Sequence, residues 1–163
     1  PLTLPRGFEG AGPGATNVWR VQVGEVVDLI IENPTHMLHP MHLHGHAFWV
    51  LGIGNCTAAA ALLRPGPPGR PVRKDTVPVP AKGCAVLRVV FDNPGPWMFH
   101  CHNALHLAAG MGGVFLVGGP ADQPVPPPGL FSDLLPRDEG ARGPPPAALC
   151  AGAGAVLLLV WGG

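Results

Sequence analysis

The chain has 163 residues, with 10 basic and 10 acidic side chains and a charged fraction of 12%. This length fits one folded domain with additional segments, and the balanced charge leaves no basic patch that would recruit nucleic acid or an anionic surface. The 24 glycines and 22 prolines disfavour long helices and suit short strands joined by turns. Composition therefore predicts an all-β fold and argues against nucleic acid as a partner.

Strand patterns begin after residues 1–16, a stretch rich in Gly and Pro that we interpret as a loop entering from a missing upstream region. Residues 18–23 alternate apolar and polar side chains and residues 26–32 form a β-branched run, which together predict a hairpin-like pair of strands. Further strands, separated by turn residues, are expected at residues 41–53, 75–79, 85–91, 97–102 and 113–117. Many short strands in one domain predict a β-sandwich.

The predicted domain spans residues 17–119 and ends where prolines begin to recur. Residues 120–146 are expected to form an extended or disordered, irregular Pro-rich linker. Residues 147–163 are mostly apolar but fall short of the roughly 20 residues that a membrane-spanning helix needs. This apolar tail is left open as a truncated span, a removable anchor signal or a low-complexity segment.

The four cysteines are too few and too irregularly spaced for a disulfide framework or paired zinc knuckles. Cys56 and Cys84 would form a disulfide only if their Cα atoms lay within about 7 Å of each other. The sequence leaves open whether they pair or are small, unpaired apolar residues.

All eight histidines lie in two short windows, residues 36–46 and residues 100–106. Such a density of imidazoles predicts a metal site. In an extended chain, residues two apart share a face while odd spacings point to opposite faces. In the first window, His42 and His44 are therefore expected on one face and His39 on the other.

In the second window, the same parity puts His100 and His102 on one face and Cys101 on the other. After the chain turns, His106 and Met111 would return to the side of Cys101. The side chains thus sort into two sets on opposite faces: His39, Cys101, His106 and Met111 in one, and His42, His44, His100 and His102 in the other.

The first set combines two imidazoles, a thiolate and a thioether, which is the trigonal ligand set of blue copper sites with a weak axial Met. Zinc prefers a tetrahedral set of strong Cys and His ligands, to which a thioether adds little. The second set has four imidazoles and no thiolate, which suits copper that binds dioxygen, although the set is incomplete as it stands. The sequence therefore predicts copper at two places.

The two windows, HPMHLHGH and HCHNALH, resemble the third and fourth copper-binding motifs of the multicopper oxidases, the family of laccases, ascorbate oxidase and ferroxidases. The likeness continues through residues 74–80, 91–95 and 97–99 and covers most of residues 18–117. The resemblance implies a Greek-key β-sandwich of the cupredoxin type, placed as the C-terminal, plastocyanin-like domain of a laccase-like enzyme.

The resemblance also implies a role for each ligand. It assigns the thiolate set to a type 1 copper, with ligands His39, Cys101 and His106 and axial neighbour Met111. It assigns the imidazole set to a trinuclear cluster, with His42 on the type 2 copper and His44, His100 and His102 on type 3 coppers. Four more histidines would come from an N-terminal cupredoxin domain of the same or another chain.

The implied activity is laccase-like oxidation of a phenol or related reductant, coupled to reduction of dioxygen to water, with His100, Cys101 and His102 as the electron-transfer bridge. A ferroxidase acting on ferrous iron, and a copper electron-transfer module without oxidase activity, remain the alternatives. As an isolated fragment the chain is expected to be inactive, since half of the cluster is missing. A secreted or extracellular location is expected, with membrane attachment through the apolar tail left open. His36 and His46 are expected to support the ligands or to lie on the surface.

Overall fold

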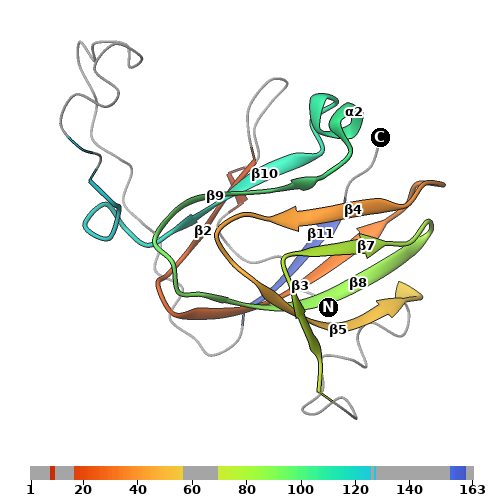
Figure 1. The fold of residues 1–163 in the computed structure, drawn as a ribbon, viewed down its shortest axis with the longest axis horizontal. Coiled ribbons are helices and arrows are strands. Elements are labelled where there is room, and N and C mark those ends of the chain that lie inside the picture. The colour runs from red at the N-terminus through yellow and green to blue at the C-terminus, as the bar shows by residue number, and fades with distance from the viewer. Residues whose placement is uncertain (1–7, 10–16, 57–69, 126, 128–154, 161–163) are drawn as a thin grey trace.

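The computed structural model describes residues 8–9, 17–56, 70–125, 127 and 155–160. Two β-sheets pack face to face, and the described residues include one short helix, α2 (Ala104–Ala108) (Figure 1). The predicted all-β sandwich is therefore confirmed. No helix in the described part of the chain is both long and apolar enough to cross a membrane.

The first sheet carries both histidine windows. Its strand order is β1 (Phe8–Glu9), β2 (Asn17–Val21), β10 (Gly112–Val117), β9 (Gly95–Cys101), β4 (His39–Leu43) and β7 (Thr76–Val79). All neighbours pair antiparallel except β2 and β10, which run parallel. The strands β4 and β9, far apart in sequence, are thus adjacent and bring the two histidine windows side by side.

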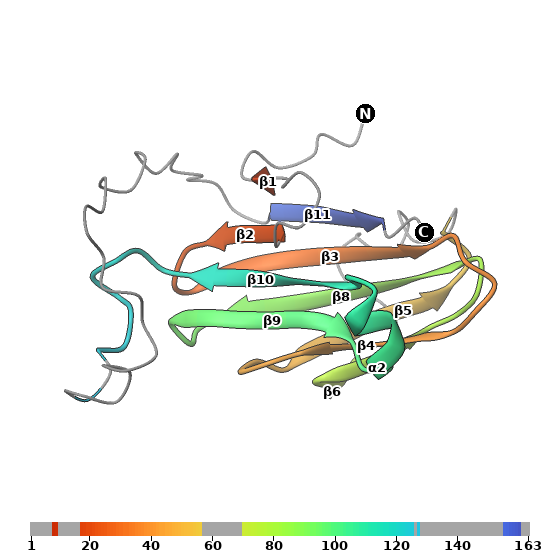
Figure 2. The ribbon, with the colours of Figure 1, turned by 90° about the horizontal axis from the view of Figure 1, so that it is seen from above.

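The second sheet has the strand order β11 (Ala155–Val160), β3 (Glu25–Asn33), β8 (Gly83–Phe91), β5 (Phe48–Gly54) and β6 (Val72–Lys74). The strand β11 runs parallel to β3 along the edge of this sheet (Figure 2). Parts of the predicted entry loop and apolar tail therefore form edge strands, β1 and β11. The boundaries of the predicted domain, linker and tail stay a prediction, and most of the linker and tail lies outside the described residues.

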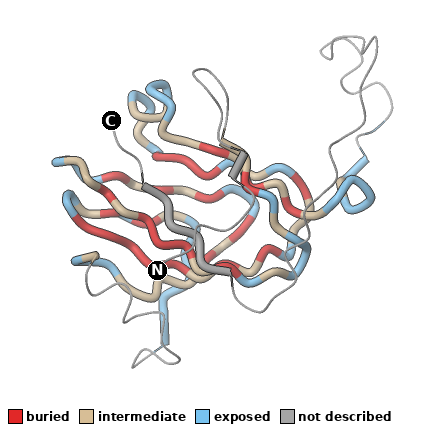
Figure 3. The backbone as a smooth tube through the Cα atoms, turned by 180° about the vertical axis from the view of Figure 1, so that it is seen from behind, coloured by how far each residue is buried: buried red, intermediate tan, exposed pale blue. Residues whose placement is uncertain are grey.

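The core lies between the two sheets, and buried residues alternate along strands such as β4 and β10. Figure 3 shows the buried segments of the backbone. Phe91 from the second sheet meets Phe115 from the first with ring centroids 4.9 Å apart, and Phe99 meets Phe115 at 5.9 Å. Removing such rings from water contributes about 25 cal/mol per Å² of apolar surface, with a further gain from tilted and edge-to-face ring contacts. This apolar packing gives the ligand-bearing strands a rigid base.

The structure corrects two predicted connections. Residues 18–23 and 26–32 do not form a hairpin, because β2 pairs in the first sheet and β3 in the second. Residues 41–53 do not form one strand, because the chain turns at Gly45, with φ +66°, and passes from β4 into β5 of the other sheet. Both errors have one cause: alternation predicts which side chains are buried, but it does not identify the partner strand.

Cys56 and Cys84 form a disulfide, with Cα atoms 5.0 Å apart. The bond joins the residues that follow β5 to the neighbouring strand β8, on the outer side of the second sheet. The pairing left open by the sequence is thus decided, while Cys150 lies outside the described residues.

Candidate metal centre

His39 and Cys101 lie at the same end of the sandwich because their strands run antiparallel. Met41 on β4 is the register partner of Cys101 on β9. His39 lies two residues before Met41 and therefore on the same face of β4. The side chain of His39 is 5% exposed and that of Cys101 is fully buried. Both therefore point into the core between the sheets.

His106 reaches this pair through a short helical turn. The side chain of Asn103 caps α2 by accepting a hydrogen bond from the Leu105 amide at 3.0 Å, a preferred role for Asn at a helix N-terminus. The turn places the Nδ1 atom of His106 3.1 Å from Nδ1 of His39 and 3.5 Å from Sγ of Cys101. Three donor atoms from separate parts of the chain thus converge, all within 4.8 Å of one another.

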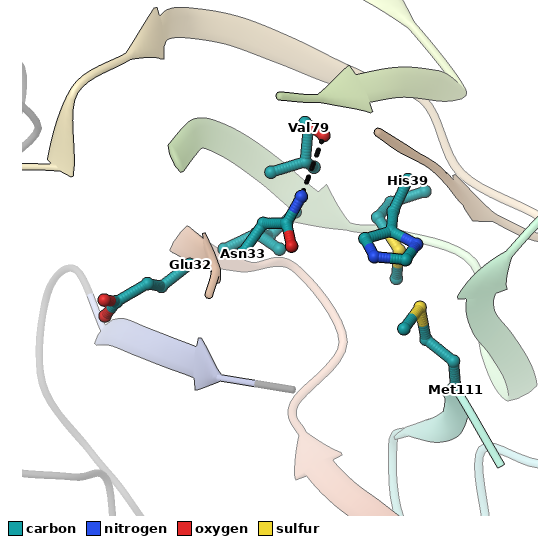
Figure 4. A pocket seen from close by; sticks show the side chains of 7 residues that line it. Glu32, Asn33, His39, Val79 and Met111 are labelled. Atoms are coloured by element: carbon teal, nitrogen blue, oxygen red, sulfur yellow. Dashed lines mark hydrogen bonds between the residues drawn. The ribbon is translucent and has the colours of Figure 1, made fainter. Parts of the chain in front are cut away.

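Met111 stands beside these three donors. Its backbone N–H donates to the His106 carbonyl and its own carbonyl accepts from the Cys101 amide, each at 3.0 Å. Met111 and His39 line a small cavity of about 10 Å³, and the thioether of Met111 points toward the imidazole of His39 (Figure 4). We call His39, Cys101, His106 and Met111 the buried set.

The chemistry of the buried set fits copper. Two imidazoles and a thiolate with a nearby thioether form the soft, trigonal donor set that copper proteins use for electron transfer. Burial, and then the proximity of His106, lower the pKa of His39 below its ordinary value. The neutral imidazole, which is the form that binds a metal, is therefore favoured.

The other four predicted ligands lie on the outer face of the first sheet, opposite the core. His42 and His100 are register partners on β4 and β9, and His44 and His102 extend the same face. The Nε2 atoms of His44 and His100 are 2.9 Å apart, and the ring of His102 lies 5.7 Å from that of His42. We call these four residues the outer set.

The outer set is more open than the buried set. His44 and His102 are exposed, and within the described residues no second group of three ligand atoms is as compact as the buried one. The pKa of His44 is lowered by partial burial first and then by repulsion from the three neighbouring imidazoles. An open array of imidazoles suits metal ions that have further ligands from another surface.

Two hydroxyl groups support the ligand rings, and sequence reasoning missed both. Nδ1 of His42 lies 2.9 Å from Oγ1 of Thr76 and 3.0 Å from the carbonyl oxygen of Asp75, while Nε2 of His39 lies 2.7 Å from Oγ1 of Thr35. Thr76 belongs to a segment that carried the family resemblance, but nothing in its spacing indicates a histidine partner. Only the pairing of β7 with β4 brings the two together.

The two leftover histidines have different environments. His36 is exposed, whereas His46 is 8% exposed and stands behind the turn that carries His44. Nε2 of His46 accepts the Asn93 amide at 3.4 Å, so Nδ1 carries the proton and donates to the His44 carbonyl at 3.3 Å. His46 therefore holds the backbone of an outer-set residue, and His36 lies on the surface.

Comparison with known proteins gives the family. Residues 5–120 match the family model described as multicopper oxidase. The chain is 43% identical over 111 residues to L-ascorbate oxidase of Cucurbita maxima, covering 62% of this chain and 18% of that protein. It is 41% identical over 128 residues to Laccase-7 of Oryza sativa subsp. japonica, covering 69% and 21%. The structure is similar to Fet3p, a multicopper oxidase that functions in iron import, with a TM-score of 0.53, 34% identity, and coverage of 61% and 21%.

The fold is a β-sandwich in which two imidazoles, a thiol and a thioether come together, a donor set that suits copper. The chain belongs to the multicopper oxidase family, as its resemblance predicted. It spans about a fifth of the length of the curated relatives that it matches. Membership in this family implies copper as the metal.

Proposed function

We propose that this chain is the C-terminal cupredoxin domain of a laccase-like multicopper oxidase. The observation that carries the proposal is the convergence of three donor atoms, from β4, β9 and α2, within 4.8 Å inside the protein. In this proposal the type 1 copper is held by the ligands His39, Cys101 and His106, with Met111 in the axial position. A buried and preorganised site keeps water away from the metal and constrains its geometry in both oxidation states.

The outer set is proposed to supply half of a trinuclear cluster, with His42 on the type 2 copper and His44, His100 and His102 on the type 3 coppers. The exposure of His44 and His102 on a sheet face supports this part, because metal ions bound there would need ligands from a second surface. An N-terminal cupredoxin domain, of the same or another chain, is proposed to provide four more histidines. The chain alone is therefore expected to lack oxidase activity.

When bound, copper would take single electrons from a reductant at the buried set and use them at the outer set to reduce dioxygen to water. The protein links the two sets covalently. Cys101 faces the interior while its neighbours His100 and His102 belong to the outer face, so a single strand end connects both. Nδ1 of His100 also lies 2.9 Å from the Cys101 carbonyl oxygen, which fixes the ring beside the link.

Phenols or related organic reductants are the proposed substrates. Exposed apolar side chains adjoin the two imidazoles of the buried set in sequence: Met37 and Leu38 are each 55% exposed, and Leu105 is 79% exposed. The first turn of α2 carries no acidic residue. These apolar side chains suit an aromatic donor better than a cation, because they offer no charge to bind ferrous iron. Glu32 also lines the cavity beside His39, but Figure 4 shows its carboxylate directed away from the imidazole.

A ferroxidase is the second candidate, favoured by the similarity to Fet3p, whose description connects it to iron import. Acidic side chains that hold iron would then come from parts of the protein outside this chain. A copper electron-transfer module without oxidase activity is the third reading. The disulfide between Cys56 and Cys84 supports a secreted or extracellular location, since such bonds persist in oxidising compartments. Membrane attachment through the apolar tail stays a prediction.

Spectroscopy and oxygen uptake of the full-length copper protein test the proposal. The wild type should be blue, and Cys101→Ser should lose both the blue absorption and oxygen uptake. The exposed His36→Ala variant is the matched histidine control and should keep both. Faster oxygen uptake with a phenol than with ferrous iron supports the laccase-like reading, the opposite order supports the ferroxidase, and a colourless wild type loaded with copper refutes the type 1 site.

A further inference from the structure

We propose that Thr35 is a positioning residue that selects the tautomer of His39 and lowers the reduction potential of copper at the buried set. The inference rests on the proposed function, since it requires copper at His39. It arises from a hydrogen-bonded chain, Asn33 to Thr35 to His39, that none of the sequence motifs predicted.

The chain of hydrogen bonds starts at Asn33, the last residue of β3, which is only 4% exposed. Its Nδ2 group faces three backbone carbonyls, those of Met37 at 2.8 Å, Pro80 at 2.9 Å and Val79 at 3.3 Å. Figure 4 shows the bond to Val79. Carbonyls only accept hydrogen bonds, so this end of the amide must be the nitrogen. The orientation of the Asn33 side chain is therefore determined, and Oδ1 faces Thr35.

Oδ1 of Asn33 then determines the direction of the Thr35 hydroxyl. It accepts the backbone N–H of Thr35 at 3.0 Å and lies 2.7 Å from Oγ1 of the same residue. An amide oxygen cannot donate, so at this short distance the hydroxyl hydrogen of Thr35 points to Asn33. The backbone of Met37 is farther away: its N–H donates to Oγ1 at 3.3 Å, and its carbonyl, the other possible acceptor for the hydroxyl, also lies at 3.3 Å. With its hydrogen on the nearer Asn33, Oγ1 presents a lone pair to its other near neighbour, the imidazole of His39.

His39 must donate to those lone pairs. Its Nε2 atom is 2.7 Å from Oγ1 of Thr35, so the neutral ring carries its proton on Nε2. Nδ1 is then unprotonated, and it is the atom that lies 3.1 Å from Nδ1 of His106 and 3.7 Å from Sγ of Cys101. The opposite tautomer would leave Oδ1 of Asn33 without the hydroxyl and would direct a proton, not a lone pair, at the metal position.

The hydrogen bond has an electronic consequence besides the geometric one. An acceptor on the far nitrogen of a ligating imidazole raises the basicity of the nitrogen that binds the metal. A more basic imidazole favours Cu(II) over Cu(I), because the harder and more highly charged ion gains more from a stronger nitrogen donor. Thr35 should therefore stabilise the oxidised copper and lower its potential.

Thr35→Val separates this effect from simple loop stability. Valine keeps the branched shape but cannot accept a hydrogen bond, and the backbone of residue 35 stays held through its carbonyl, which accepts the Lys82 amide at 3.0 Å, and through its N–H to Asn33. Removing a supporting hydrogen bond of this kind costs about tenfold in metal affinity at the lower end of its range. If the affinity for Cu(II) falls tenfold while the affinity for Cu(I) is unchanged, the one-electron reduction potential rises by about 59 mV.

The test is the midpoint potential of the blue copper in the full-length protein, followed by its visible absorption during redox titration. Thr35→Val should raise the potential, Thr35→Ser should restore the wild-type value, and Thr76→Val should leave it unchanged. Thr76→Val is the matched control because its hydroxyl faces His42, on the other side of the sheet. The thermal unfolding midpoint of each metal-free variant shows whether the fold is intact.

The outcomes are distinct from those of the proposed function. A wild type without blue absorption refutes the copper site itself. A blue wild type whose potential is the same in Thr35→Val, or shifts equally in Thr35→Val and Thr35→Ser, overturns the role of the hydroxyl while the copper site stands. If Thr35→Val unfolds, Thr35→Ser still tests the role, because serine keeps the hydroxyl. A copper hyperfine splitting of Thr35→Ser that differs from the wild-type value would then refute the role of the hydroxyl.

Discussion

Replacing Gly45 with Ala should destabilise the protein by two separable effects. Gly45 lies in the turn between His44 and His46, with φ +66°, a conformation that costs a residue with a Cβ about 1 kcal/mol. A Cβ at this position would also overlap the six-membered ring of Trp97. The indole cannot retreat freely, because its Nε1 donates to the Asn93 carbonyl at 2.8 Å.

The size of the effect follows from a matched glycine. Gly24 has φ +82° and no atom within 4 Å of its would-be Cβ, so Gly24→Ala carries only the backbone cost of about 1 kcal/mol. Overpacking against a fixed side chain adds about 1–3 kcal/mol. The free energy of unfolding should therefore fall by about 2–4 kcal/mol in Gly45→Ala and by about 1 kcal/mol in Gly24→Ala.

Urea denaturation of the metal-free protein, followed by tryptophan fluorescence, measures both values. A double-mutant cycle with Trp97→Leu isolates the steric part, because the smaller side chain should relieve the overlap but not the backbone cost. If Gly45→Ala costs no more than Gly24→Ala, or if the cycle shows no coupling to position 97, the close approach of Trp97 is not what requires glycine here.

Three further predictions concern stability. Burial lowers the pKa of His46 below its ordinary value of 6.5, so as pH falls the unfolded chain takes up the proton first. The metal-free protein should therefore lose stability as pH falls through this value, and His46→Gln should lose less. An equal dependence of the unfolding free energy on pH in wild type and variant would contradict this. Replacing Cys56 and Cys84 by Ala opens a loop with a sequence separation of 28, which should cost about 3.5 kcal/mol, and reduction of the wild type should give a similar loss. Arg88 and Asp28 form a bidentate salt bridge that is partly exposed, with both N to O distances 2.7 Å. Asp28→Asn should therefore lower the free energy of unfolding by at most about 1 kcal/mol in urea titrations, and by less in high salt.

Much of the candidate metal site could be predicted from local sequence patterns and residue types. The alternation of side chains along a strand is a property of the backbone, so parity within each window separated Cys101 from His100 and His102 without knowledge of the fold. The structure places Cys101 in the core and the two histidines on the outer face. The residue types then limited the metal, since thiolate, imidazole and thioether together favour copper.

The pairing of the strands was harder to predict from the sequence. The alternating residues 18–23 and the apolar run at 26–32 were recognised as strands, but their assignment to different sheets depends on the burial of both sheets at once. The turn at Gly45 was missed because its signal, a glycine beside Trp97, involves a contact across 52 positions of the sequence. Contacts of this range are decided by the packing of the whole core.

The sequence by itself determined the all-β class, the family and the division of the ligands between two faces, because each depends on residue types and short spacings. Tertiary structure alone decided the Cys56 to Cys84 bond, the burial of His46, and the hydroxyl partners of His39 and His42. Those contacts join segments whose distance in space is set by the pairing and packing of strands. A hydrogen bond needs its two atoms within about 3 Å, and no local pattern can specify a distance between segments that only the folded core brings together.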